Sequence, residues 1–339
     1  MPERAAEIIA VEYACPEKVE TNLDLEKLYP TWNMCSVAKR TGVYQRHVAG
    51  PEECASDLAY RACVKLLARA AVAPSAIDGL IVCTESPDYI LPPNAPLLQH
   101  RLGLAKSVAA FDYTLACSGY IYGLAISKAF IEAGLLENIL LVTCDTYSKY
   151  IRPDDRGART LFGDGAAATL IRRGERGIGE VDLATDGSGA GSFILKNGGC
   201  RNGVHQHGGD SPQDDVHIHM DGPAVLNFVK GEIPAFITNL LRKGRLAPEQ
   251  VDLFIFHQAS KTALDELQAI LKIPCDRTFS NLEKMGNTVS SSIPIAIHDA
   301  WRAGRVKPGM VTLLVGFGAG LSWGGVFVRW TNNFMTIPA

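Results

Sequence analysis

The feature that most constrains the fold of this chain is an internal repeat. Residues 72–86 read VAPSAIDGLIVCTES, and 174 residues further on residues 246–260 read LAPEQVDLFIFHQAS. Each segment has Ala-Pro, an Asp, a run of apolar residues typical of a buried strand, and a polar end that closes on Ser. The period is far too long for a solenoid, so we expect two similar halves, residues 1–172 and 173–339.

Further segments repeat in the same order. The helix expected over residues 121–132 has a counterpart over 293–302, and each is followed by Ala-Gly and then an apolar run. The segment FGDGAAATLI, which begins at Phe162, likewise matches FGAGLSWGGVFV, which begins at Phe317. Helices that alternate with continuous apolar strands predict an α/β protein whose sheets carry helices on both faces.

Composition narrows the class of protein and its partners. Of the 339 residues 47% are hydrophobic, and the net charge is −3 with no basic run, so we expect a globular protein that does not bind nucleic acid. Nine scattered cysteines without a CxxC pair suit a reducing compartment. The N-terminus carries early charges and no long apolar stretch, which predicts no signal peptide and a cytoplasmic location. The uncharged run over 311–328 contains GFGAG and indicates two strands and a turn, so no membrane is expected either.

A cysteine stands where a strand turns into a helix. Residues 107–115 predict a buried strand, and residues 119–133 have small and apolar residues at helical spacing. Cys117 therefore lies at or just before a helix N-terminus, where unpaired N–H groups and the helix dipole favour a thiolate. Gly119 and Gly123 leave room for a substrate or another backbone to approach. Cys117 is thus a candidate nucleophile, the alternative being a small buried cysteine at a helix start.

The repeat brings two more residues to the same place. When two similar halves pack about a pseudo-twofold axis, their equivalent loops meet at the centre. His257 follows the strand expected over 253–256, and Asn287 stands in the counterpart of the cysteine turn. We therefore expect Cys117, His257 and Asn287 to converge. Taken singly, His257 could be a capped core histidine and Asn287 a turn residue.

Five segments together resemble the β-ketoacyl-acyl-carrier-protein synthase III family of the thiolase superfamily. They read ACSGYIYGL, DRGARTLFGDGAAATLI, FHQAS, GNTVSSSIPIAI and GFGAGLSWG, in the order of that family and over nearly the whole chain. The resemblance implies the five-layered αβαβα thiolase fold, a homodimer, and no metal or cofactor. It also implies a Cys-His-Asn active site at Cys117, His257 and Asn287.

The chemistry implied by the resemblance is a decarboxylative Claisen condensation. Cys117 takes the acyl group of an acyl-CoA, and a malonyl thioester on acyl carrier protein then loses CO2 to become an enolate. His257 and Asn287 would each donate a hydrogen bond to the enolate oxygen. Backbone N–H groups of Cys117 and of Ala319, in the turn 318–320, would hold the oxyanion.

The resemblance also implies five positions that contact substrate. Arg40 and Arg156 match residues that hold the nucleotide of CoA, Phe162 matches a residue of the acyl pocket, and Met220 lies in a segment that binds substrate. Leu91 matches a residue that reaches into the pocket of the neighbouring subunit. The alternatives are a surface ion pair for either arginine and a packed core residue for Phe162.

Departures from the family concern the entrance of the site. Ser36 stands where many members stack a Trp on adenine, Thr262 replaces a carrier-binding Arg, Ser260 replaces an Asn, and Pro223 stands where an Asn is usual. A specialised pathway therefore remains open beside fatty-acid initiation. Other possibilities are acyl transfer to an ester or amide without decarboxylation, a hydroxymethylglutaryl-CoA synthase-like condensation, and chalcone-synthase-like chemistry, although that family has GFGPG. A non-catalytic binding subunit would typically lack the nucleophile.

Two further features are less specific. The repeat pairs Cys83 with His257, so Glu85 lies two residues past the partner of a catalytic residue. Hydroxymethylglutaryl-CoA synthases use a similar Glu as general acid/base, and an exposed Glu that caps the following turn is the alternative. Four histidines form two HxH pairs, for which we expect a solvated loop leading into a strand rather than a metal site. They are His205, His207, His217 and His219.

Overall fold

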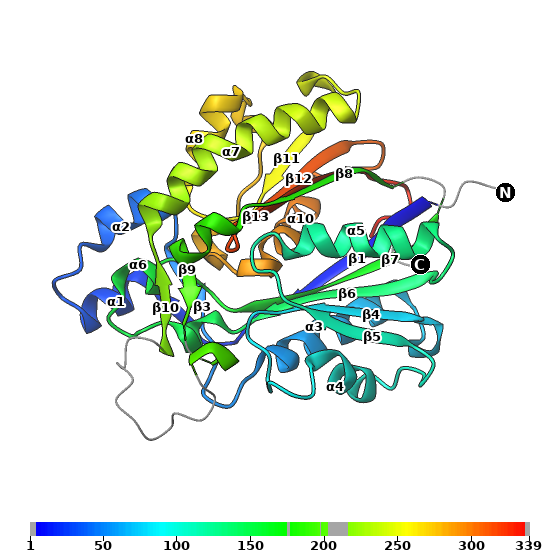
Figure 1. Cartoon of the computed structure of the whole chain (residues 1–339), viewed down its shortest axis with the longest axis horizontal. Helices are drawn as coiled ribbons and strands as arrows, with labels where there is room; N and C mark the ends of the chain where they lie inside the picture. The colour runs from blue at the N-terminus through cyan, green and yellow to red at the C-terminus, as the bar shows by residue number, and fades with distance from the viewer. Residues whose placement is uncertain (1–4, 175–176, 197, 203–215, 336–339) are drawn as a thin grey trace.

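Two β-sheets with equivalent strand orders form the frame of the molecule (Figure 1). The computed structural model describes residues 5–174, 177–196, 198–202 and 216–335. The first sheet has five strands, in the order β1 (Ala5–Ala14), β7 (Gly165–Gly174), β6 (Asn138–Asp145), β4 (Gly79–Cys83) and β5 (Ala109–Tyr113). The second sheet has four, in the order β8 (Ile178–Thr185), β13 (Ser322–Arg329), β12 (Val311–Gly318) and β11 (Leu253–Phe256).

The strand directions match as well as the order. In the first sheet β7 runs antiparallel to β1 and β6, whereas β4 runs parallel to β6. In the second sheet β13 runs antiparallel to β8 and β12, whereas β11 runs parallel to β12. The duplication expected from the sequence is therefore confirmed as two sheets with one topology.

The fifth strand distinguishes the first sheet from the second. β5 pairs parallel with β4 at the sheet edge, while its place in the second sheet is taken by a single parallel bridge between Phe254 and Thr278. The sequence predicted a buried strand over 107–115. That prediction is wrong about burial, because an edge strand has a neighbour on one side only, and β5 is shorter and only partly covered.

Helices complete five layers. α3 (Ala55–Ala70) and α4 (Asn94–Arg101) cover the outer face of the first sheet, and α7 (Gly222–Lys243) and α8 (Lys261–Leu271) lie on the outer side of the second. α5 (Gly119–Glu132) and α10 (Ser292–Arg302) lie between the sheets and contact both. This is the αβαβα arrangement that the family resemblance implied.

The remaining elements gather at one end of the sheets, on the left in Figure 1. Two short strand pairs lie there, β2 (Val19–Thr21) with β3 (Gln45–His47) and β9 (Phe193–Leu195) with β10 (Ile218–Met220). Four helices accompany them: α1 (Asn22–Leu28), α2 (Met34–Thr41), α6 (Arg156–Arg159) and α9 (Leu282–Met285). The uncharged run over 311–328 forms β12 and β13, as predicted. Within the described residues, no helix combines the length and apolarity that a membrane crossing requires.

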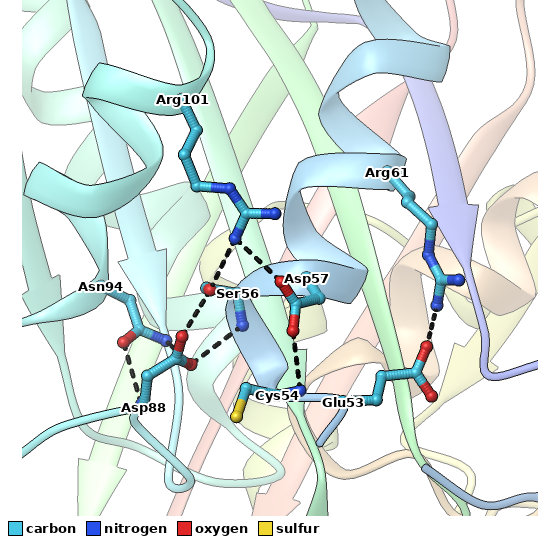
Figure 2. A network of polar contacts seen from close by, with 8 residues as sticks. All are labelled: Glu53, Cys54, Ser56, Asp57, Arg61, Asp88, Asn94 and Arg101. Atoms are coloured by element: carbon cyan, nitrogen blue, oxygen red, sulfur yellow. Dashed lines mark hydrogen bonds and ion pairs between the residues drawn. The ribbon is translucent and has the colours of Figure 1, made fainter. Parts of the chain in front are cut away.

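A polar network fixes the loop between β4 and α4 (Figure 2). Asp88 and Asn94 close this loop reciprocally, since the Asp88 N–H donates to Asn94 Oδ1 (3.1 Å) and Asn94 Nδ2 donates to Asp88 Oδ1 (3.3 Å). The Asp88 carboxylate also accepts from the backbone N–H (3.1 Å) and hydroxyl (2.5 Å) of Ser56 in the first turn of α3. Arg101 of α4 contacts both Ser56 and Asp57, 3.0 Å away in each case. The segment 88–94 is thereby attached at both ends to the outer helix layer.

The loop held in this way presents apolar side chains to solvent. Tyr89, Ile90 and Leu91 are 59%, 76% and 83% exposed. An exposed run of three large apolar residues on an anchored loop is typical of a contact surface rather than of scattered surface residues.

Candidate active site

Cys117 lies at the turn from β5 to α5, as the sequence predicted. Ser118 is the N-cap of α5, and its hydroxyl lies 2.7 Å from the hydroxyl of Ser322 at the start of β13. Cys117 itself is buried. The turn that carries the thiol is therefore fixed by a contact with the second half of the molecule.

Opposing influences act on the ionisation of Cys117. Burial raises the pKa of the Cys117 thiol above its ordinary value, and the nearby carboxyls of Asp145 and Glu85 raise it further. The N-terminus of α5 acts in the opposite direction, as expected from the sequence. The thiolate at Cys117 therefore stays a prediction, and burial acts against it.

The glycines around the thiol have different roles from those expected. A methyl group on Gly318 would lie 2.7 Å from Cβ and 3.0 Å from Sγ of Cys117, so only glycine lets the end of β12 lie against this thiol. The absent side chains of Gly119 and Gly123 are replaced by Cys83 Sγ and by the Tyr113 hydroxyl. These two glycines therefore accommodate side chains of the first sheet rather than a substrate or another backbone.

His257 follows β11 directly and is buried. Its Nδ1 lies 2.7 Å from the hydroxyl of Ser292, the first residue of α10. Burial lowers the pKa of His257 to about 3, so the imidazole is neutral throughout the range in which enzymes work. A neutral imidazole held by one nitrogen can still donate a hydrogen bond from the other.

Asn287 faces His257 from the turn before α10. Its Oδ1 accepts from the backbone N–H of Val289 (2.9 Å), which leaves Nδ2 directed at Nε2 of His257, 3.4 Å away. The Asn287 backbone N–H donates to the Leu161 carbonyl (2.9 Å), and its carbonyl accepts from the Gly163 N–H (3.0 Å). Asn287 is therefore fixed on both sides of Phe162, in the first half of the chain.

A cavity of about 580 Å³ connects these residues with the surface. Cys117, His257 and Asn287 are buried on its wall. Four positions that the resemblance implied in substrate binding line the same cavity, namely Arg40, Arg156, Phe162 and Met220. Both arginines are exposed and Phe162 is buried, so the cavity runs from a basic mouth to an apolar interior.

Most of the residues that differ from the usual family residues at the entrance also lie around this cavity. Ser260, Thr262 and Pro223 line it, while Ser36 is exposed on α2 outside the lining. The Thr262 hydroxyl donates to the Arg40 carbonyl (3.0 Å) and so joins α8 to α2 at the mouth.

Three other predicted residues lie outside this lining. Leu91 is on the exposed loop described above. Ala319 and Glu85 line a second, smaller cavity of about 90 Å³. Ala319 directly follows Gly318, and within the described residues neither the Ala319 N–H nor the Cys117 N–H donates to another backbone carbonyl. Both N–H groups are thus available to a ligand.

Glu85 is partly buried, unlike the exposed turn cap that was the alternative. Its backbone N–H donates to Asp145 Oδ1 (2.8 Å), and burial raises the pKa of its carboxyl to about 7. Asp145 ends β6 and also accepts from the hydroxyl (2.5 Å) and N–H (3.4 Å) of Ser290. Asp145 therefore connects the Glu85 turn with the turn that carries Asn287.

Ser292, Ser290 and Asp145 were not singled out from the sequence. The available signal was the run of three serines in GNTVSSSIPIAI, because hydroxyls that follow a candidate catalytic residue and precede an apolar helix are expected to be buried with partners. Which partner each serine has depends on tertiary contacts.

The histidine pairs lie apart from the site. His219 is exposed in β10 and His217 precedes that strand, which was the expected arrangement, whereas His205 and His207 lie outside the described residues. Among the residues that the structure describes, no three His, Cys, Asp or Glu side chains cluster in a way that could hold a metal ion.

Comparison with known proteins gives the family. The model of 3-oxoacyl-[acyl-carrier-protein] synthase III matches residues 111–187, and the model of the C-terminal part of that enzyme matches residues 241–330. The β-ketoacyl-[acyl-carrier-protein] synthase III of Caldanaerobacter subterraneus subsp. tengcongensis is 37% identical over 97% of this chain and 98% of its own length.

Solved structures agree with the sequence relatives. A 3-oxoacyl-(acyl-carrier-protein) synthase III has a TM-score of 0.91 at 40% identity, over 96% of this chain and 100% of the other. The synthase III of Pseudomonas aeruginosa PAO1 has a TM-score of 0.87 at 33% identity, over 99% and 100%. With this identity over nearly the full length of both chains, the protein belongs to the β-ketoacyl-acyl-carrier-protein synthase III family of the thiolase superfamily.

Proposed function

We propose that the protein condenses an acyl-CoA starter with a malonyl thioester on acyl carrier protein, with loss of CO2, to give a 3-oxoacyl product. The observation that carries this proposal is the convergence of Cys117, His257 and Asn287 on one cavity, with a neutral imidazole beside an amide. Family membership supports the same reaction, because its relatives are named for it.

Acylation comes first. The Sγ of Cys117 attacks the thioester carbonyl, the bond to CoA breaks, and CoA leaves as a thiol with the proton that Cys117 releases. The oxyanion formed on the way would be held by the N–H groups of Cys117 and Ala319, each worth about 3 kcal/mol in comparable sites. Arg40 and Arg156, exposed at the cavity mouth, would bind the phosphates of CoA.

Decarboxylation follows at the other two residues. The malonyl carboxylate leaves as CO2, and its bonding electrons form an enolate whose oxygen accepts from His257 Nε2 and Asn287 Nδ2. For His257 to donate there, the Ser292 hydroxyl must donate to Nδ1, so Ser292 sets the tautomer. The enolate carbon then attacks the acyl carbonyl, and the bond to Cys117 breaks. No base is needed, since loss of CO2 replaces removal of a proton from carbon.

We also propose a homodimer. The anchored apolar loop with Leu91 lies in the same part of the chain as the edge strand β5, whose open side lacks a strand neighbour. A second copy would cover both, and Leu91 would then reach the neighbouring active site. Light scattering at micromolar concentration should give twice the chain mass, and Leu91→Asp should lower it. A monomeric wild type would contradict this part of the proposal.

We further place the protein in the cytoplasm and divide it at residues 172 and 173. All nine cysteines are free thiols, as suits a reducing compartment. β7 ends at Gly174 and β8 begins at Ile178, so the proposed division falls near the connection between the two sheets.

The experiment that tests the function is intact-protein mass spectrometry with a panel of acyl-CoAs, followed by addition of malonyl-acyl carrier protein. We expect an acyl adduct on Cys117 that disappears when the malonyl thioester is added, with release of CO2 and a 3-oxoacyl product. An adduct that is instead transferred to an alcohol or amine would contradict the proposed reaction.

A further inference from the structure

The smaller cavity beside the active site holds a carboxyl group that the mechanism above does not use. We call it the Glu85 cavity; it has a volume of about 90 Å³, and its wall includes Glu85, Tyr147, Tyr150, Phe193, Ile218 and Ala319. Apart from the carboxyl and the two phenols, the side chains of these residues are apolar. The volume suits a few heavy atoms of a ligand rather than a whole cofactor.

The Glu85 cavity adjoins the nucleophile. Phe193 lines both this cavity and the catalytic one, and Ala319 follows the glycine that lies against Cys117 Sγ. The ring of Tyr147 lies 5.4 Å from that of Phe162 and 6.2 Å from that of Phe193, centroid to centroid. Phe193 and the adjacent rings of Phe162 and Tyr147 therefore form the boundary between the catalytic cavity and the Glu85 cavity.

The Glu85 carboxyl has no partner of its own. Within the described residues its side chain makes no hydrogen bond or ion pair, and only its backbone N–H is engaged, with Asp145. Leaving a partly buried carboxyl unpaired costs free energy, as its raised pKa reflects. The Glu85 oxygens are not among the fully buried atoms that lack a hydrogen bond, so water can reach them, and a ligand that fills the cavity would remove that water.

We propose that the Glu85 cavity is the far end of the starter site, and that Glu85 selects an acyl group bearing a hydrogen-bond donor, either a hydroxyl or an amino group. This inference rests on the proposed function. Glu85 does not line the cavity that holds His257 and Asn287, so its position fits recognition of the acyl chain better than proton transfer at the malonyl carbon.

The physical basis is an asymmetry in polar recognition. A site built to accept a hydrogen bond rejects an analogue that lacks the donor, because the buried acceptor is then left unsatisfied. An unsubstituted acyl chain would desolvate Glu85 completely without pairing it, whereas a hydroxyl or amino group would supply the missing donor. Selection therefore acts mainly against plain alkyl starters.

The test is a competition for Cys117. Equal concentrations of butanoyl-CoA and 3-hydroxybutanoyl-CoA, and in a second series butanoyl-CoA and 3-aminobutanoyl-CoA, are mixed with the full-length protein, and the ratio of adducts is read by intact mass at early times. We expect the wild type to prefer at least one substituted chain by about tenfold or more. Glu85→Leu should reverse that preference, and Glu85→Gln should weaken it.

The ratio of the two adducts does not depend on how much of a variant is folded, because both acyl-CoAs compete for the same folded molecules. Glu137→Gln, at an exposed glutamate next to the start of β6, is the matched control and should keep the wild-type ratio. Should Glu85→Leu not fold, the near-isosteric Glu85→Gln still decides the point.

The outcomes separate this inference from the function it rests on. If the wild type takes butanoyl as readily as both substituted chains, or if neither Glu85 variant alters the ratio, the inference is overturned while the proposed function stands. If no acyl-CoA acylates Cys117 at all, the proposed function fails and the inference fails with it.

Discussion

The two halves carry different functional residues at the same pair of turns. In the first half the turn before the central helix carries Cys117, the proposed nucleophile, and the strand end carries Cys83, whose thiol is buried and donates to the Leu115 carbonyl. In the second half the strand end carries His257, and the turn before the central helix carries Asn287. Each half thus supplies part of the chemistry, and the site exists only where the halves meet.

The two halves also differ at the residue two positions after Cys83 and at the residue two positions after His257. After His257 it is Ala259, whose carbonyl lies 3.5 Å from Asn287 Nδ2. After Cys83 it is Glu85, whose carboxyl has no hydrogen-bond partner among the residues that the structure describes. A shared backbone frame therefore fixes where functional groups can stand, while single side chains decide which positions act.

The largest effect is expected from removing the nucleophile. Cys117→Ala should reduce acylation and condensation to background, a loss of at least about a thousandfold, because no other group forms the acyl intermediate. Cys83→Ala, at the turn that corresponds to His257, should retain activity. An undiminished acyl adduct on Cys117→Ala would show that Cys117 is not the nucleophile. Cys83 and Cys144 would then be the candidates.

The role of the second half is tested by replacing its two proposed hydrogen-bond donors. His257→Ala and Asn287→Ala should each slow decarboxylation of the malonyl thioester about a hundred- to a thousandfold, the usual loss for one oxyanion donor. Acylation of Cys117 should fall much less, since neither side chain takes part in the acylation step proposed above. Wild-type rates of CO2 release in both variants would show that the halves do not divide the reaction in this way.

A smaller effect is expected where the halves touch. Gly318→Ala places a methyl group against Cys117, so acylation should slow by about tenfold to a hundredfold through displacement of the thiol. Gly187→Ala is the matched control, because nothing lies within 4 Å of the added methyl group. Equal acylation rates in the two variants would mean that the thiol tolerates displacement.

The smallest effect concerns stability and pH. The pKa of Glu85 is raised from 4.5 to about 7 in the folded protein, so folding is favoured by proton binding below about pH 4.5, and this contribution is lost as the pH rises through 7. Glu85→Gln should therefore match the wild type near pH 4 and be more stable by about 1 kcal/mol near pH 8, after allowance for partial exposure. Thermal denaturation at both pH values measures the difference, and a gain that does not depend on pH would exclude an ionised Glu85 as its cause.

The same variant tests the acid/base hypothesis for Glu85. If Glu85 moved a proton during condensation, Glu85→Gln would shift a limb of the pH profile of condensation. A profile of unchanged shape would leave recognition of the acyl chain as its role.

Most of the two-sheet arrangement could be predicted from the sequence, because the repeat can be recognised by comparing short segments of the chain. Matching strands, the central helices and the approach of Cys117, His257 and Asn287 all followed from aligned segments. The sequence did not predict which strand lies at the edge of a sheet. It also did not predict which side chain packs against a given glycine. The exposure of β5, the neighbours of Gly119 and the burial of Cys117 each depend on contacts between residues far apart in the chain.

The central layer has a consequence for the order in which the molecule can be made. α5 belongs to the first half, yet it packs on β12 and β13, which leave the ribosome long after it. The Met335 N–H also donates to the Ile9 carbonyl at 2.8 Å, so the first strand is completed by residues that are synthesised much later. During translation the nascent first half therefore carries an uncovered apolar helix. Cys117 lies against Gly318 at the end of β12, so its final surroundings form only after β12 has been synthesised.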